Sequence, residues 1–192
     1  MHKLFNIYRR ELQELTTAPE DDASKLYMQL AGTYQNLLAT LDAAYADTAA
    51  VRRNKKFWEL LRVDLRAFGN TQELWRESIT DCRELDLGKL LPGLDSTLAT
   101  LEGRLTHGAA LWQAQQTPDS TPESSDTSLL TELPLDIDTR AVTGLSHLQH
   151  AALLNFVSQL KALDCTSREL LQTLRVLAGL DPATALHNHA HK

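Results

Sequence analysis

The sequence predicts an all-α protein: a helical bundle of about five helices, a polar linker and a C-terminal helical hairpin. Two observations support the helices. Apolar side chains recur at spacings of three and four along most of the chain, which is the period of an α-helix, and no stretch shows a convincing strand pattern. A third observation separates the predicted helices into two groups: residues 115–128 (QQTPDSTPESSDTS) contain no large apolar side chain. Such a segment cannot bury enough surface to offset the entropy of ordering it.

The bundle is predicted to begin with two helices. Residues 4–16 form the first, because their apolar residues recur on one stripe. Pro19 and the acidic residues that follow it suit the first turn of a second helix. We expect that helix to cover residues 23–50, which contain no proline and keep leucine at helical spacing.

Three more helices are predicted before the linker. Residues 51–68 place Phe57, Trp58 and Leu61 on one side and cations on an adjoining side. Gly69 is expected to end this helix, and Asn70 to cap a separate helix over residues 71–84. A loop around Gly88 and Pro92 then leads into a helix with leucines spaced by fours and threes, which reaches Trp112.

The C-terminal part is predicted to be an extended segment followed by two helices. Residues 129–137 are apolar but interrupted by Pro134, so we expect them to pack on the bundle in extended form. A helix over residues 145–163 is expected to end in a tight turn at Asp164-Cys165-Thr166. Thr166 and Glu169 form a capping-box pattern that would start a second helix, which Gly179 would end.

These elements define three predicted units: a bundle over residues 1–115, an acidic Ser/Thr/Pro linker over 116–135, and a hairpin over 136–192 with a frayed histidine-containing tail. Two helices cannot bury all the apolar side chains of the hairpin between themselves. We therefore expect a docking face that covers the bundle, a second copy or another protein. Its predicted residues are Leu153, Phe156, Val157, Leu160, Leu171 and Leu174.

Charge gives a second candidate contact surface. The net charge of −6 argues against a protein that coats nucleic acid non-specifically. Cations nevertheless gather on the predicted helix 51–68, and two more lie on the outer side of the second hairpin helix. They could follow a phosphate backbone or an acidic partner, or they could be a solvated face paired with carboxylates such as Glu59 and Asp64. These predicted contact residues are Arg52, Lys55, Arg62, Arg66, Arg168 and Arg175.

No motif identifies a chemistry, so we predict no catalytic residues, no metal site and no cofactor. Glycine-rich phosphate loops, nucleophile elbows and zinc-protease motifs are absent. His147 and His150 are spaced for a helical ligand pair but have no second pair, and the alternating tail histidines could take up a metal only adventitiously. Asp136 and Asp138 are expected to form turns, and Cys82 to be a half-buried thiol.

These observations lead us to expect a non-catalytic helical interaction protein, an adaptor or subunit of a larger assembly. Its partner would be another protein or a second copy. The alternative is a nucleic-acid-associated subunit of a nucleoprotein complex, and the third is a helical metal or cofactor enzyme. The first residues lack a signal-peptide pattern, no apolar run suits membrane insertion, and Cys82 and Cys165 make no CxxC pair, so we expect a cytoplasmic protein.

Overall fold

The structure, a computed structural model, describes residues 2–14, 55–114 and 127–181, together with isolated positions between 25 and 43. Four long helices dominate it: α1 (His2–Glu14), α4 (Lys55–Asp81), α6 (Leu94–Ala114) and α7 (His147–Leu177). The short elements are α5 (Leu87–Leu90) and two 3₁₀ helices, η1 (Thr127–Leu130) and η2 (Ala141–Gly144). These described ranges contain no strand, which confirms the all-α prediction.

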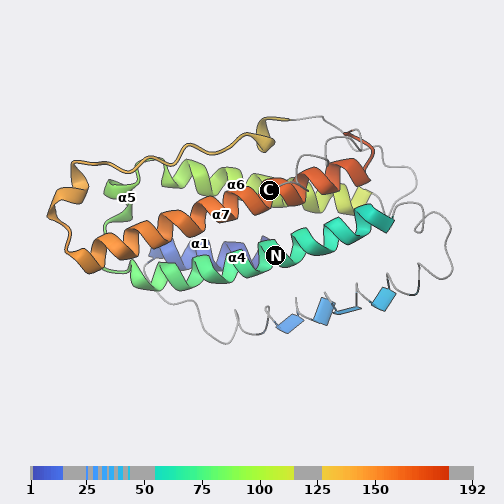
Figure 1. Ribbon diagram of the computed structural model, residues 1–192, viewed down its shortest axis with the longest axis horizontal. Coiled ribbons are helices and arrows are strands. Elements are labelled where there is room, and N and C mark those ends of the chain that lie inside the picture. Colours follow the sequence, from blue (N-terminus) through green and yellow to red (C-terminus); the bar gives the residue numbers. More distant parts are fainter. Residues whose placement is uncertain are drawn as a thin grey trace.

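The long helices lie side by side, with α1 and α4 running in one direction and α6 and α7 in the other (Figure 1). Helix α7 packs against α4 and α6, and α1 packs against α6 and α4. One hydrophobic core joins them, and it includes Leu98 and Leu101 from before residues 115–126 as well as Leu160 and Leu163 from after them. Helices from both sides of the polar segment therefore share one interior.

Helix α4 is a single helix of 27 residues, so the predicted break at Gly69 and Asn70 is wrong. Phe68 and Trp75, one on each side of Gly69, are both fully buried. A glycine inside a helix costs about 1 kcal/mol, whereas burial of each large apolar side chain contributes about 1.5–3 kcal/mol. Thr71 also donates its hydroxyl to the carbonyl of Ala67 within the helix, at 2.9 Å. Packing across the glycine therefore prevails over the local stop signal.

Helix α7 is likewise continuous over 31 residues, so the predicted C-terminal hairpin is wrong. The residues expected to make the turn are helical instead. Thr166 donates its hydroxyl back to the carbonyl of Ala162 at 3.0 Å rather than capping a new helix, and Ser167 donates to the carbonyl of Asp164 at 2.9 Å. No proline or glycine interrupts residues 147–177. Asp164 also pairs with the buried Arg104 at 2.6 Å, and this contact stabilises the helical form there.

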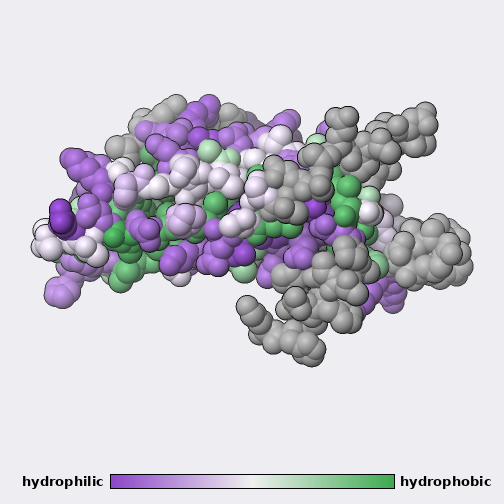
Figure 2. All heavy atoms as spheres, turned by 90° about the horizontal axis from the view of Figure 1, so that it is seen from above, coloured by the Kyte–Doolittle hydropathy of each residue, from purple (hydrophilic) through white to green (hydrophobic). Residues whose placement is uncertain are grey.

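The strap, residues 127–138, crosses from η1 toward η2 over α6 (Figure 1). As predicted, it is mostly extended and packs on the bundle: Leu135 is buried, and the amide of Asp138 donates to the carbonyl of Leu90 at 2.9 Å. Its first turn, η1, is a 3₁₀ helix rather than extended chain. Figure 2 views this side from above, and hydrophilic residues interrupt its hydrophobic areas.

Three predicted features fall outside the described residues: most of the helix 23–50, the polar segment 115–126 and the tail from 182. The described positions between 25 and 43 are helical and exposed. None of the described helices is long and apolar enough to cross a bilayer.

Candidate functional site

The cationic face, which we define as Lys55, Arg62 and Arg66, lies on the exposed side of α4. Spacings of seven and four place its three side chains on one face of a helix. Trp58 fixes the rotation of α4, because its ring packs edge-on against Trp112 of α6 with 6.1 Å between the centroids. Lys55 pairs with Glu59 at 3.6 Å. Of the four cations predicted on this helix, three thus share one exposed face, and the fourth, Arg52, lies outside the described residues.

Arg62 and Arg66 differ from Lys55, since neither has an ion pair among the residues that the structure describes. Like charges one helical turn apart destabilise a helix by roughly 0.2–0.5 kcal/mol. Val63 lies between them in sequence and has 59% of its surface exposed. Two arginines with their charge uncompensated, beside an exposed apolar residue, can bind a surface that offers carboxylates or phosphates around an apolar contact.

The two predicted cations of α7 do not extend the cationic face. Arg175 is fully buried and binds the Asp181 carboxylate through two hydrogen bonds, from Nε at 2.7 Å and from Nη2 at 3.1 Å. Arg168 is half-buried and pairs with Asp164 at 3.1 Å. Both arginines therefore bind carboxylates of their own chain, and they lie on a different helix from Arg62 and Arg66.

The predicted docking face is also occupied within the chain. All six of its residues are buried, and they belong to the same core as the other long helices: Leu153, Phe156, Val157, Leu160, Leu171 and Leu174. Helix α6 approaches closely at Gly108, where an added Cβ would lie 3.1 Å from Cδ1 of Leu174. The apolar excess of α7 thus covers its own bundle, which was one of the predicted destinations.

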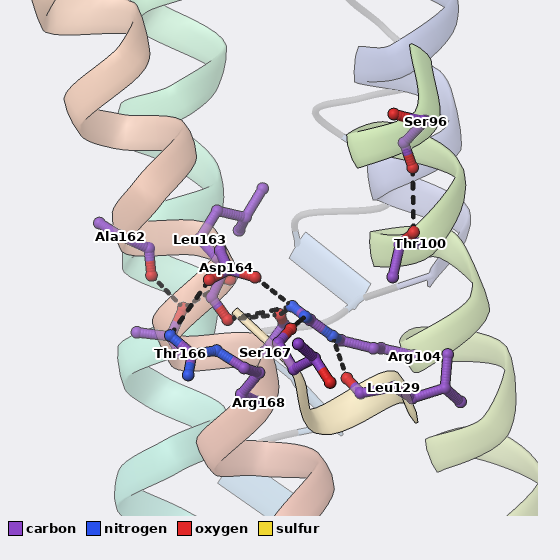
Figure 3. Close-up of polar contacts among 11 residues, drawn as sticks. Ser96, Thr100, Arg104, Leu129, Ala162, Leu163, Asp164, Thr166, Ser167 and Arg168 are labelled. Atoms are coloured by element: carbon purple, nitrogen blue, oxygen red, sulfur yellow. Dashed lines mark hydrogen bonds and ion pairs between the residues drawn. The ribbon is translucent and has the colours of Figure 1, made fainter. Parts of the chain in front are cut away.

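Arg104 of α6 forms the most extensive buried polar cluster that the structure describes (Figure 3). Nη1 donates to Oδ1 of Asp164 at 2.6 Å and to the hydroxyl of Ser167 at 3.0 Å. Nε donates to the carbonyl of Leu129 at 2.5 Å, and Nη2 to that of Thr131 at 2.7 Å. Burial lowers the pKa of Arg104, and the bond to Asp164 opposes that shift. One guanidinium therefore ties α6, α7 and the strap together.

A second polar group joins α1 to α4. The hydroxyl of Tyr8 donates to Oε1 of Glu73 at 2.6 Å, and the guanidinium of Arg76 lies over the ring of Tyr8, 5.6 Å from its centroid. Burial, followed by the bond to Glu73, raises the pKa of Tyr8 far above its usual value. Glu11 is buried and pairs with Arg83 at 3.6 Å. These contacts position α1 on α4.

The remaining predicted candidates are placed apart from these groups. His147 is exposed, and His150 lies with Nδ1 3.0 Å from the carbonyl of Ser146. The amide of Arg140 donates to Oδ1 of Asp138 at 2.8 Å, as in a turn. Within the described ranges, no three histidine, cysteine or acidic residues gather as metal ligands would. The tail histidines lie outside those ranges.

The two cysteines are expected to differ in reactivity. Both are free thiols, but Cys82 is buried and Cys165 is exposed. Burial raises the pKa of Cys82 to about 11, and burial followed by Glu169 raises that of Cys165. Because the thiolate is the reactive form, Ellman's reagent at about pH 8 should titrate one thiol in the folded chain and the second only in urea. C165S should abolish the fast reaction and C82S should retain it; equal rates for both thiols would contradict the buried position of Cys82.

No family model, curated protein or solved structure matches this chain.

Proposed function

We propose that the protein is a non-catalytic helical interaction protein, an adaptor or subunit of a larger cytoplasmic assembly, which binds an acidic patch of a partner protein through Arg62, Val63 and Arg66. The observation that carries this proposal is the pair of exposed arginines that lack an ion pair among the described residues and flank an exposed valine. Their mutual repulsion is relieved when a partner supplies carboxylates.

A nucleic-acid-associated function is the second candidate, because the same cationic face could contact phosphates. Lys55 and Arg66 are eleven residues apart, which is about 16 Å along a helix and suits a few phosphates at most. With three cations, the logarithm of the binding constant would fall with the logarithm of the salt concentration with a slope near −2.7. Proteins that make six to ten phosphate contacts show a much steeper dependence. The few cations and the net charge of −6 favour a protein partner.

The double variant R62E/R66E, which reverses both charges, is expected to weaken partner binding at least about tenfold, because attraction to carboxylates becomes repulsion. The matched control is R140E/K161E, which makes the same charge change at two exposed cations on other elements. A partner captured with the wild-type chain would be purified, and its affinity for all three chains measured by titration calorimetry. Equal weakening by both double variants would show a net-charge effect, and no weakening by R62E/R66E would remove this surface from the function.

The nucleic-acid candidate is tested on the same three chains with duplex DNA and single-stranded RNA at about 50 and 200 mM salt. We expect no specific binding. Binding that weakens with salt and is abolished by R62E/R66E but kept by R140E/K161E would instead establish the second candidate.

A further inference from the structure

The exposed side of α4 carries two pairs of like charges, one in each half of the helix. The basic pair is Arg62 and Arg66, and the acidic pair is Glu77 and Asp81. All four side chains are exposed, and none has an ion pair among the residues that the structure describes. Each pair is spaced by four, so its two charges repel each other. Asp81 also ends α4, where the helix dipole disfavours a negative charge.

The two pairs lie on the same side of α4. At about 100° per residue, the four positions fall within an arc of about 100°. Val63 and Leu74 border this arc, with 59% and 48% of their surfaces exposed. We call this surface the α4 outer face, formed by Arg62, Val63, Arg66, Leu74, Glu77 and Asp81.

We propose that the α4 outer face binds the same face of a second copy, with the two α4 helices antiparallel about a two-fold axis. Fifteen residues separate Arg62 from Glu77, and also Arg66 from Asp81. An antiparallel pair with its midpoint between residues 71 and 72 therefore places Arg62 level with the partner's Asp81. It places Arg66 level with the partner's Glu77. The two-fold axis repeats both contacts, so one self-complementary surface gives four ion pairs.

This inference rests on the proposed function, because it names the protein whose carboxylates Arg62 and Arg66 bind. Both halves of the α4 outer face gain from the same contact. The repulsion within the basic pair and the repulsion within the acidic pair are offset together when opposite charges meet.

The charge pattern favours the antiparallel arrangement over a parallel one. In a parallel pair in register, the arginines of one copy would meet the arginines of the other, and such like-charge contacts oppose association. Leu74 lies close to the midpoint of the antiparallel pair. The two copies of Leu74 are then about 8 Å apart along the helices, and they supply an apolar contact between the charged ends.

The area of the α4 outer face sets the strength of this dimer. Residues 62–81 cover about 28 Å of helix, and a helix with its side chains is about 10 Å wide. The resulting footprint of about 300 Å² is well below the roughly 800 Å² that each partner contributes to a standard interface. The dimer is therefore weak and salt-sensitive, with a dissociation constant of about 1 µM or higher.

Sedimentation equilibrium of the full chain tests the dimer. At about 1 to 500 µM chain and about 50 mM salt, we expect monomers and dimers in equilibrium, with a shift toward monomers at about 1 M salt. R62E/R66E and E77R/D81R should each weaken the dimer at least about tenfold. The control R140E/K161E should dimerise like wild type. A monomeric wild type, or R62E/R66E that dimerises as wild type does, would overturn the inference.

A mixture of the two double variants tests the pairing itself. Every acidic position of the R62E/R66E chain then meets a basic position of the E77R/D81R chain, so all four ion pairs return in a mixed dimer. The two chains have net charges of −10 and −2, because the wild-type charge of −6 falls or rises by four. Attraction between net charges therefore does not explain a mixed dimer. We expect the mixture to dimerise like wild type, and a monomeric mixture would contradict the pairing.

The fourfold variant R62E/R66E/E77R/D81R keeps the net charge of wild type and decides the outcome if a double variant loses its helical circular dichroism. It should dimerise with itself as wild type does, and it should not pair with the wild-type chain. A monomeric fourfold variant beside a dimeric wild type would overturn the proposed contact. Loss of a captured partner on R62E/R66E, with a monomeric wild type, would leave the proposed function standing and assign the carboxylates to a different protein.

Discussion

Replacement of Arg104 by alanine is expected to lower the free energy of unfolding by about 3–5 kcal/mol, the cost of breaking a buried ion pair. The change leaves Asp164 buried with only the half-buried Arg168 as a cation partner. It also removes the donors from two carbonyls of the strap, those of Leu129 and Thr131. Urea unfolding followed by circular dichroism measures the loss, and a smaller midpoint with an unchanged slope is the expected signature.

The matched control is Arg140→Ala, which removes an exposed arginine and should change stability by less than about 0.5 kcal/mol. Asp164→Ala completes a double-mutant cycle. Because the two residues share one bond network, the second substitution should cost less in the R104A background than in wild type, with a coupling of about 0.5–3 kcal/mol. Strict additivity, or a loss below about 1 kcal/mol for R104A, would contradict the role of the cluster in holding the strap.

Helical periodicity predicted the elements whose burial follows from neighbours in the sequence. Residues 4–16 and the leucines from Leu94 onward needed one apolar stripe each, and both are helices in the structure. The extended segment 129–137 could be predicted because Pro134 excludes a helix interior. In each of these segments, the pattern of neighbouring residues agrees with the way the segment packs in the structure.

The two predicted breaks were wrong because local capping signals are worth about 1 kcal/mol, less than the packing that opposes them. At Gly69 the opposing groups are Phe68 and Trp75, both fully buried; their spacing of seven fits one face of a continuous helix, but the prediction gave more weight to the stop signal. At Asp164 the opposing group is Arg104, 60 residues away. Long-range partners of this kind decide whether a helix stops, and one sequence does not reveal them.

The candidate site residues differ in the same way: placement that depends on local spacing could be predicted, whereas placement that depends on distant partners could not. Lys55, Arg62 and Arg66 could be placed on one exposed face because their spacing is local. Arg175 was predicted to face outward, yet it is buried, because the continuous α7 turns it toward Asp181. Arg104 was missed, although it had one signal: it lies three residues after Leu101 and seven before Leu111, at a position of the buried seam of α6. A cation on such a seam indicates a buried carboxylate partner.

Cys165→Pro is expected to lower the free energy of unfolding by at least about 3 kcal/mol, and it separates a continuous α7 from a hairpin. Inside a helix, proline removes the backbone donor and clashes with the carbonyl four residues earlier. It also disfavours the helical conformation of the preceding residue, which here is Asp164, so the bond to Arg104 is lost as well. In a turn at residues 164–166, the same substitution would cost little.

The control is Cys165→Ala, because the thiol is exposed and its one described contact is with Oε1 of Glu169 at 3.6 Å. Alanine favours a helix, so C165A should stay within about 0.5 kcal/mol of wild type. Guanidinium unfolding of both variants, followed by far-ultraviolet circular dichroism, measures the difference in their free energies of unfolding. If C165P kept the stability and helicity of C165A, the chain would bend at 164–166. Arg104 would then need another partner, and the R104A loss should fall toward that of an exposed arginine.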